Sequence, residues 1–320
     1  MRKAMRRLGA RRYWAIWVAV VPLLAWALVR GLGLDSGNSL APLMTLTPWV
    51  ALAALFVFGV AAALENWAAA LAAGLALTIL ALAVLPRAFG EGEAVPAGAT
   101  TVTVLSVNAH AGAVDPEALV ELVADLQPDL LAVQEMAPPL DRRLRRAGLG
   151  RYLPESVVQF PLPSDPKRRP GIGTYARLPL RHLAGGASSS LRVLVELEGR
   201  RNLRLVDFHP LKPLSDPQRW RDALAGLPSA GHRAPWMVAG DFNATPDEAA
   251  FREVLDRGYR DAATVTGDGL QMTWPVGHSF PPLVAIDHVL VDERLGIADF
   301  GAVALPGSDH KAVWAEVFQR

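Results

Sequence analysis

The chain of 320 residues contains no cysteine, and charged residues make up only 20% of it. The lack of cysteine excludes a disulfide framework and a zinc site built from thiolates, and it fits either a reducing or an oxidising compartment. Charge is missing altogether from three stretches near the amino terminus, residues 13–29, 36–64 and 66–86. Long uncharged stretches of this kind are typical of segments that enter a membrane.

These three stretches are predicted to form transmembrane helices near 13–30, 48–64 and 66–86. A spanning helix needs about 20 mostly apolar residues, and about 17 is the lower limit. One stretch alone could also be a buried core helix or a cleaved signal peptide. Three of them so close together are hard to bury otherwise, and the segment Val29-Arg30-Gly31-Leu32 is a poor cleavage site.

The charges beside the apolar stretches predict an orientation. Residues 1–12 contain six lysines and arginines and no acidic residue, whereas only Arg30 and Arg87 flank the stretches on the other side. The positive-inside rule therefore places the amino terminus in the cytoplasm. With three spans, everything after Arg87 is expected outside the cytoplasm, in a multi-pass protein of the cell membrane.

Residues 88–99 are rich in glycine, alanine and proline and are predicted to be a linker. The remainder, 100–320, is expected to be one domain, with 24 lysines and arginines against 27 aspartates and glutamates, a net charge of −3. Proteins that hold DNA non-specifically usually carry a basic surface, which this composition does not indicate. Two basic clusters, at 142–146 and 167–169, are either phosphate-binding patches or a solvated helix face and a loop.

The pattern of apolar residues in this domain predicts an α/β fold. Four helices are expected, three of them starting at an Asp-Pro or Thr-Pro pair at Asp115, Asp216 and Thr245, and the fourth at 138–147. Apolar runs predict strands at 101–107, 129–134, 171–177, 191–198, 202–208, 235–240, 284–291 and 311–318. Dominant strands with interspersed helices favour a four-layer α/β sandwich, in which two packed β-sheets are flanked by helices.

Several of the predicted strands end in polar residues of the kinds that bind metals or transfer protons. Each one alone is weak evidence, because Asn and Asp are common turn formers and single histidines are usually structural. Together they are expected to form a ring at one edge of the sandwich. The residues are Asn108, Glu135, His209, Asp241, Asn243, Asp287, Asp309 and His310.

The segments that carry these residues resemble motifs of the endonuclease/exonuclease/phosphatase superfamily, which includes pancreatic deoxyribonuclease, apurinic endonucleases, sphingomyelinases and inositol phosphatases. The matching segments occur in the family's order and are SVN (106–108), VQE (133–135), FHP (208–210), GDFN (240–243), IDH (286–288) and SDH (308–310). The segment GIGTYARLPL (171–180) also resembles a family strand, with Ala176 in place of a serine. The resemblance covers essentially the whole of 100–320.

The resemblance implies hydrolysis of phosphodiester bonds with a divalent metal ion. Glu135 is the implied principal ligand, with Asn108 beside it and Asp309 completing the site. Carboxylate and amide oxygens are the ligands that Mg²⁺ prefers, and they suit Mn²⁺ and Ca²⁺ as well. The metal is therefore expected to be Mg²⁺, with Mn²⁺ and Ca²⁺ open as alternatives.

The resemblance also implies roles for the other residues. Asp241 would orient or deprotonate the attacking water, and Asn243 would donate a hydrogen bond to a phosphoryl oxygen. His310 would contact the phosphate and transfer a proton, with Asp287 holding its ring. His209 would lie near the leaving group.

Some positions depart from the repair nucleases of the family. His110 stands where they carry an acidic residue, and its role is left open. Met136 replaces a lysine, and only 73 residues separate Glu135 from His209, so loops that grip DNA must be short. His288 is expected on the opposite face of its strand and has no assigned role. The same holds for His182, His232 and His278.

The leading interpretation is a membrane-anchored, metal-dependent phosphodiesterase, nuclease-like by its FHP and GDFN segments. A phosphatase or a phospholipid or sphingomyelin phosphodiesterase of the same fold is the alternative, which the membrane helices and the net charge favour slightly. The substrate is thus a phosphate ester, either nucleic acid or lipid headgroup, and no protein partner is predicted. A binding module without activity is the alternative of another class, and it would be expected to have lost some of these residues.

Overall fold

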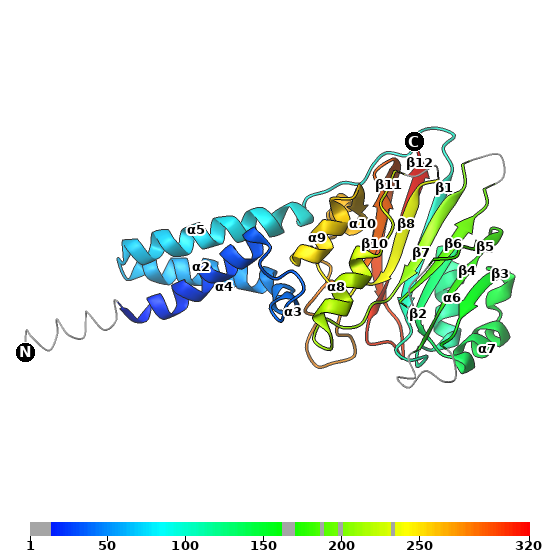
Figure 1. Ribbon diagram of the computed structural model, residues 1–320, viewed down its shortest axis with the longest axis horizontal. Helices are drawn as coiled ribbons and strands as arrows, with labels where there is room; N and C mark the ends of the chain where they lie inside the picture. Colours follow the sequence, from blue (N-terminus) through cyan, green and yellow to red (C-terminus); the bar gives the residue numbers. More distant parts are fainter. Residues whose placement is uncertain (1–13, 162–169, 186–188, 198–200, 232–233) are drawn as a thin grey trace, which may run out of the picture.

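The computed structural model describes residues 14–161, 170–185, 189–197, 201–231 and 234–320 (Figure 1). The basic segment 1–12, the cluster 167–169 and His232 lie outside the described residues.

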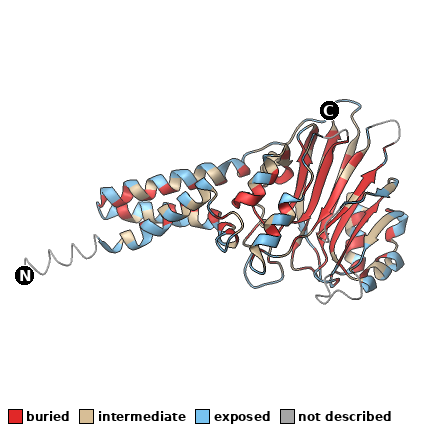
Figure 2. Ribbon diagram, in the orientation of Figure 1, coloured by how far each residue is buried: buried red, intermediate tan, exposed pale blue. Residues whose placement is uncertain are grey.

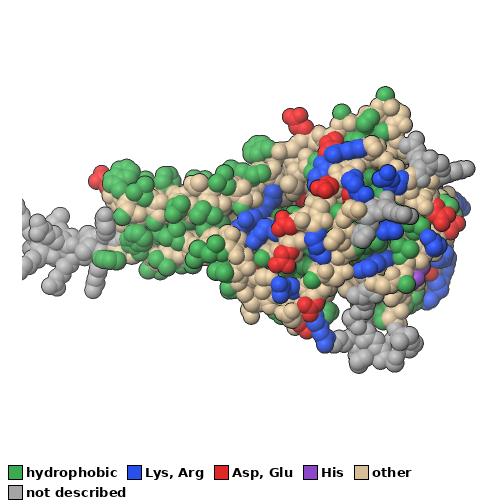
Figure 3. All heavy atoms as spheres, turned by 45° about the horizontal axis from the view of Figure 1, so that its top comes forward, with side chains coloured by type: hydrophobic (Ala, Val, Ile, Leu, Met, Phe, Trp, Pro, Cys, Tyr) green, Lys and Arg blue, Asp and Glu red, His purple; other side chains and the backbone are tan. Residues whose placement is uncertain are grey.

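Apolar helices occupy the three uncharged stretches and form a rod beside the sheets (Figure 1). They pack on one another through small side chains such as Ala54, Ala73 and Ala76, which are fully buried and let the backbones approach closely. The outer surface of the rod is apolar (Figure 3), with Leu71 and Phe56 more than two-thirds exposed. The helices are α2 (Trp17–Leu32), α3 (Ala41–Met44), α4 (Thr47–Ala63), α5 (Trp67–Val84) and the 3₁₀ turn η1 (Leu85–Ala88).

The lengths of these helices do not support three spanning segments. Among the described residues, only the continuous segment Trp67–Ala88, with 22 residues, is long and apolar enough to cross a membrane. Helices α2 and α4 are apolar but contain 16 and 17 residues.

The rest of the chain forms two six-stranded sheets. One has the order β11-β12-β1-β2-β4-β3 and the other β5-β6-β7-β8-β10-β9. Each sheet contains one parallel pair, β1 with β2 and β7 with β8, while the other neighbours are antiparallel. The strands are β1 (Thr101–Asn108), β2 (Leu130–Met136), β3 (Glu155–Gln159), β4 (Gly171–Ala176), β5 (Leu180–His182), β6 (Ser190–Val195), β7 (Leu203–Phe208), β8 (Trp236–Asp241), β9 (Tyr259–Asp261), β10 (Asp287–Asp292), β11 (Leu295–Ala304) and β12 (Lys311–Gln319).

The two sheets pack face to face, and helices cover their outer faces (Figure 2). Val104, Leu205 and Val289 are fully buried between the sheets. Helices α6 (Pro116–Leu126) and α7 (Pro138–Ala147) cover the first sheet, whereas α8 (Pro217–Ala225) and α9 (Ala249–Leu255) cover the second; the short α10 (Ala262–Thr266) lies beside β11. The predicted sandwich of two packed sheets flanked by helices is therefore confirmed.

Helices α6 and α8 begin where the sequence predicts. Asp115 and Asp216 each accept a hydrogen bond from the backbone N–H three residues later, at 2.9 and 3.0 Å, and thereby cap the helix. The structure also contains elements that were not predicted, namely β3, β5, β9, β11 and α10.

The helix predicted with Thr245 as its N-cap instead has Glu248 as its N-cap and starts at Ala249, so the predicted start was wrong by three residues. Glu248 does bond back to the N–H of Thr245 at 2.9 Å, as in a capping box. However, residues 245–248 form a turn, and the N–H of Ala249 donates to Asp35 at 2.9 Å. The cap comes from the amino-terminal segment, which a local pattern cannot reveal.

The same turn holds the helical rod onto the domain. Arg87 donates two hydrogen bonds to the carboxylate of Asp247, at 2.6 and 2.8 Å, and Arg30 donates a third at 3.1 Å. Asp247 is fully buried, and the side chains of Arg87 and Arg30 are only 6% and 16% exposed. The two cations beside the apolar stretches are thus ion-paired within the protein.

Replacing Asp247 with alanine is expected to destabilise the protein by about 3–5 kcal/mol, because two buried guanidinium groups lose their counter-charge. Thermal unfolding of the purified full chain in detergent measures this as a lower melting temperature. Asp256→Ala, at an exposed carboxylate at the end of α9, is the control and should change stability by less than about 0.5 kcal/mol. Equal melting temperatures for the two variants would contradict the prediction.

Candidate active site

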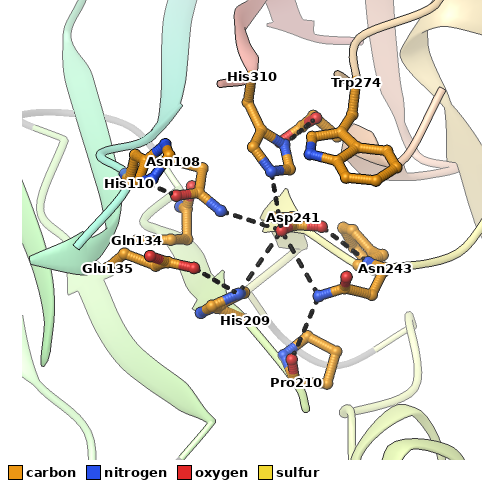
Figure 4. A network of polar contacts seen from close by, with 12 residues as sticks. Asn108, His110, Gln134, Glu135, His209, Pro210, Asp241, Asn243, Trp274 and His310 are labelled. Atoms are coloured by element: carbon orange, nitrogen blue, oxygen red, sulfur yellow. Dashed lines mark hydrogen bonds and ion pairs between the residues drawn. The ribbon is translucent and has the colours of Figure 1, made fainter. Parts of the chain in front are cut away.

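The predicted polar residues do meet at one edge of the sandwich (Figure 4). Because β1 and β2 are parallel, Asn108 and Glu135 leave the first sheet side by side. Strands β7 and β8 are also parallel and end at Phe208 and Asp241. Strand β10 runs the other way and begins with Asp287 directly opposite Asp241.

Asp241 lies at the centre of the group and is fully buried. Its Oδ2 accepts a hydrogen bond from Asn108 Nδ2 at 3.0 Å, and it lies 3.5 Å from His209 Nε2 and 3.8 Å from His310 Nε2. Its Oδ1 accepts from the N–H of Asn243 at 2.8 Å. The preceding residue must be glycine, because a Cβ at Gly240 would lie 1.9 Å from the carbonyl oxygen of Phe208.

His310 and Asp287 form a buried pair beside Asp241. Nδ1 of His310 lies 2.9 Å from Asp287 Oδ2, which also accepts a hydrogen bond from Thr273 Oγ1 at 2.6 Å. Burial favours the neutral imidazole, but the negative charges of Asp287 and Asp241 outweigh it and raise the pKa of His310 to about 9. The ring is therefore oriented by Asp287 and presents Nε2, the nitrogen that Asp287 does not contact, to Asp241.

Glu135 has a strained backbone. It lies at a bulge between Val133 and Met136 and adopts a φ of 52°, a conformation that favours glycine. Such strain costs on the order of 1–3 kcal/mol and is concentrated at functional sites. Oε2 accepts a hydrogen bond from the N–H of Ala111 at 2.7 Å, while Oε1 lies 3.6 Å from His209 Nε2.

Asp309 and His110 form the exposed rim of the site. Asp309 Oδ1 lies 2.8 Å from His110 Nδ1, and Asp309 Oδ2 accepts a hydrogen bond from Trp274 Nε1 at 3.3 Å. Asp309 Oδ1 is also 3.9 Å from His310 Nε2, so it reaches the same side of the site. His110, whose role the sequence left open, thus contacts a predicted metal ligand.

The remaining residues of the site also lie close together. His209 stands between Glu135 and Asp241, and Asn243 donates from Nδ2 to the carbonyl of Pro210 at 3.3 Å. The structure therefore brings all the predicted side chains to the same edge of the sandwich.

Two further residues beside the site were not predicted from the sequence: Trp274, which contacts Asp309, and Lys212, whose Nζ lies 6.0 Å from the Trp274 ring. Lys212 follows the FHP segment by two residues, which was the available sequence signal.

The histidines without an assigned role lie elsewhere. His288 points to the opposite face, as expected: it is buried, lies 3.2 Å from Asp261 and packs against Phe251. His182 and His278 are exposed. The basic cluster at 142–146 lies on α7, where Arg145 pairs with Asp141 at 3.1 Å, so the solvated helix face is the better interpretation.

The donor set of the site fits a hard divalent cation. Asn108 and Glu135 offer amide and carboxylate oxygens at adjoining strand ends, and Oε1 of Glu135 faces only the His209 ring among the described residues. Asp241, Asp287 and His310 also have potential ligand atoms within 4.8 Å of one another, a grouping that was not predicted. His310 and Asp287 already bond to each other, however, so Glu135 and Asn108 remain the better candidates for the ligands.

Two cavities flank the site. The first, here called the Glu135 cavity, has a volume of about 310 Å³ and is lined by Glu135, His209 and Lys212, among others. The second, here called the Leu46 cavity, has a volume of about 240 Å³ and reaches from Asn243 and His310 to Leu46. Lys212 lines both.

The sequence was compared with models of protein families and with curated proteins. Residues 105–310, which include all the residues of the ring, match the Endonuclease/Exonuclease/phosphatase family. No curated protein matches the sequence.

Solved structures are similar to the chain at low identity. One is D. rerio TDP2 complexed with single strand DNA product, with 17% identity, a TM-score of 0.51, and 68% of this chain and 99% of that chain covered. Another is an AP endonuclease from Archaeoglobus fulgidus, with 14% identity, a TM-score of 0.50, and 67% and 98% covered. A third is an endonuclease/exonuclease/phosphatase from Beutenbergia cavernae DSM 12333, with 16% identity, a TM-score of 0.50, and 68% and 72% covered. These similarities establish the fold.

Proposed function

The chain belongs to the endonuclease/exonuclease/phosphatase family, and we propose that it is a membrane-anchored hydrolase of phosphodiester bonds that requires a divalent metal ion. The observation that supports this most directly is the convergence of Asn108, His209, Asn243 and His310 on the buried carboxylate of Asp241. A module that only binds would have no need to keep every one of these groups.

Each group has a place in the hydrolysis of a phosphodiester. The reaction needs an activated water, positive groups against the phosphoryl oxygens and a proton for the leaving alkoxide. Asp241 orients or deprotonates the water, and Asn243 donates to a phosphoryl oxygen. His310, held by Asp287 with Nε2 facing Asp241, contacts the phosphate and transfers the proton that the leaving alkoxide takes up. His209, on the Glu135 side of Asp241, lies near the leaving group.

Glu135 and Asn108 would hold the metal ion, with Asp309 as a further ligand. When bound, a divalent cation such as Mg²⁺, Mn²⁺ or Ca²⁺ supplies Lewis-acid stabilisation of charge on the phosphoryl oxygens. The protein contributes the fixed position of Glu135, which the bulge in β2 and the hydrogen bond from Ala111 maintain.

The membrane part of the proposal rests on the apolar rod. Segment Trp67–Ala88 is long enough to span, and the exposed apolar surface of α2 and α4 suits lipid rather than water. The cations in residues 1–12 favour a cytoplasmic amino terminus and a catalytic domain outside the cytoplasm. A reporter fused after Arg320 that is active only outside the cytoplasm would support this orientation; activity inside would refute it.

The proposed activity predicts strict dependence on metal. The full chain, purified in detergent, should hydrolyse bis(p-nitrophenyl) phosphate in the presence of Mg²⁺, Mn²⁺ or Ca²⁺. Excess EDTA should abolish the hydrolysis, because it removes the positive charge of the metal ion that holds the phosphate beside the carboxylates of the site. Added metal should restore the hydrolysis. Hydrolysis that persists in EDTA after extensive dialysis would contradict the metal requirement.

A further inference from the structure

The Leu46 cavity joins the reactive groups to the amino-terminal helices. It is lined by Asn243 and His310 of the candidate active site and also by Pro42, Thr45 and Leu46. These three residues lie in and beside α3, outside the part of the chain that matches the family. The helical rod therefore supplies part of a cavity that opens onto the candidate active site.

This wall is held firmly in place. Trp49, in the first turn of α4, donates a hydrogen bond from Nε1 to the carbonyl of Leu283 at 2.7 Å. Leu283 also lines the cavity. Ala41 of α3 is fully buried against the core of the second sheet, in a cluster with Phe208 and Phe242. The cavity is thus a fixed feature of the junction between rod and domain.

The walls of the cavity are mostly aliphatic. The lining includes Leu283, Val284 and Ile286 from the segment before β10, and Pro213 and Leu214 from the segment after β7. Leu214 is 82% exposed and leaves an apolar surface available at the cavity. Helix α4 begins at Thr47, directly after Leu46, so the apolar wall continues into the apolar rod.

Few basic side chains line the Leu46 cavity and the Glu135 cavity. Lys212 is the only lysine or arginine among the described residues that line either cavity, and it stands between the aliphatic walls and the Glu135 cavity. Proteins that hold single-stranded nucleic acid instead combine a basic groove with several aromatic platforms. Here Trp274 is the one aromatic residue that lines the Leu46 cavity in the described part of the chain.

We propose that the Leu46 cavity binds the apolar part of an amphiphilic phosphodiester, a lipid taken from the membrane that surrounds the rod. Its phosphate then lies at Asp241 and His310, near the charge of Lys212, and its apolar chain lies against Leu46 and Leu283. This proposal rests on the proposed phosphodiesterase activity and names the substrate class of the same site.

The test compares p-nitrophenyl alkyl phosphates whose alkyl group is methyl, butyl or octyl, using the full chain held in amphipol. Each methylene that enters the cavity should raise kcat/KM by about 4-fold, the value for burial of one CH₂, until the cavity is filled. In Leu46→Ser, the ratio of kcat/KM for the octyl ester to that for the methyl ester should fall at least tenfold. Leu214→Ser, at an exposed position that tolerates substitution, should lower the same ratio several-fold.

Leu43→Ser is the matched control, because Leu43 belongs to the same short helix and is 45% exposed but does not line the cavity. Its ratio should equal that of the unmodified protein. If kcat/KM does not change with alkyl length while the methyl ester is hydrolysed, the lipid proposal is overturned but the proposed phosphodiesterase activity is supported. Faster cleavage of a single-stranded oligonucleotide than of the octyl ester would also overturn it. Failure to hydrolyse any of these substrates would instead refute the proposed activity.

Discussion

Replacing His310 with glutamine is expected to lower kcat for phosphodiester hydrolysis by about 10²–10⁴-fold, the usual contribution of a general acid or base. The imidazole is almost fully buried, and Asp287 fixes it through Nδ1. The neighbouring carboxylates raise its pKa to about 9, so it carries a proton that it can donate at neutral pH. Glutamine retains a hydrogen-bonding group of similar size but supplies neither the charge nor the proton. The loss is therefore expected in kcat rather than in KM.

The histidines outside the site provide the controls for this experiment. His182→Gln and His278→Gln change exposed side chains and should leave kcat within about twofold of the unmodified value. Asp287→Asn should lower kcat less than His310→Gln, because the imidazole remains but loses the carboxylate that orients it. A His310→Gln protein with an unchanged melting temperature and near-normal turnover would remove His310 from the mechanism.

Local patterns predicted those parts of the fold that local chemistry determines. Asp115 and Asp216 cap α6 and α8 because a side-chain oxygen reaches an N–H three residues ahead. The ring of polar residues was also predictable as a group, since parallel neighbours end at the same edge of a sheet. Asn108 and Asp241 are 133 positions apart, and they meet because both lie at that shared edge. The local sequence around either residue does not indicate the contact.

The parts that could not be predicted depend on distant contacts. Thr245 and Glu248 carry a helix-start signal, but Arg30 and Arg87 hold the intervening Asp247 in a turn. The position of the second apolar helix was predicted to within one residue, since 48–64 was expected and α4 is Thr47–Ala63. Its assignment as a spanning segment is not supported, because part of the uncharged stretch 36–64 folds as the separate helix α3, which docks against the domain, and α4 has only 17 residues.

Trp274 and Lys212 illustrate a further limit of sequence reasoning. Trp274 stands on the segment before β10, and only the fold brings its Nε1 within 3.3 Å of Asp309. Lys212 is a single cation in a mixed segment, and its importance comes from its position between two cavities. Trp274 acts through its place in the fold and carries no spacing by which it can be found, whereas the one sequence signal for Lys212 is its position two residues after the FHP segment.

Replacing Glu135 with glutamine is expected to lower kcat/KM by about 10²–10⁴-fold, comparable to the loss at His310. The reason is different, because Glu135 would hold the metal rather than transfer a proton. Titration of Mn²⁺ into the purified full chain, followed by calorimetry, should show a Kd at least tenfold weaker than that of the unmodified protein. Glu121→Gln, at an exposed position on α6, removes the same charge and should change neither quantity.

Glutamine also separates the chemical role of Glu135 from its structural role. The carboxylate accepts a hydrogen bond from the N–H of Ala111, and the amide oxygen of glutamine can accept the same bond. The backbone strain at this residue is unchanged, since neither glutamate nor glutamine adopts a φ of 52° readily. The melting temperature of the variant should therefore stay close to normal while metal binding and activity are lost. If Mn²⁺ affinity is unchanged although activity falls, the metal is held elsewhere, and the buried group of Asp241, Asp287 and His310 becomes the site to test.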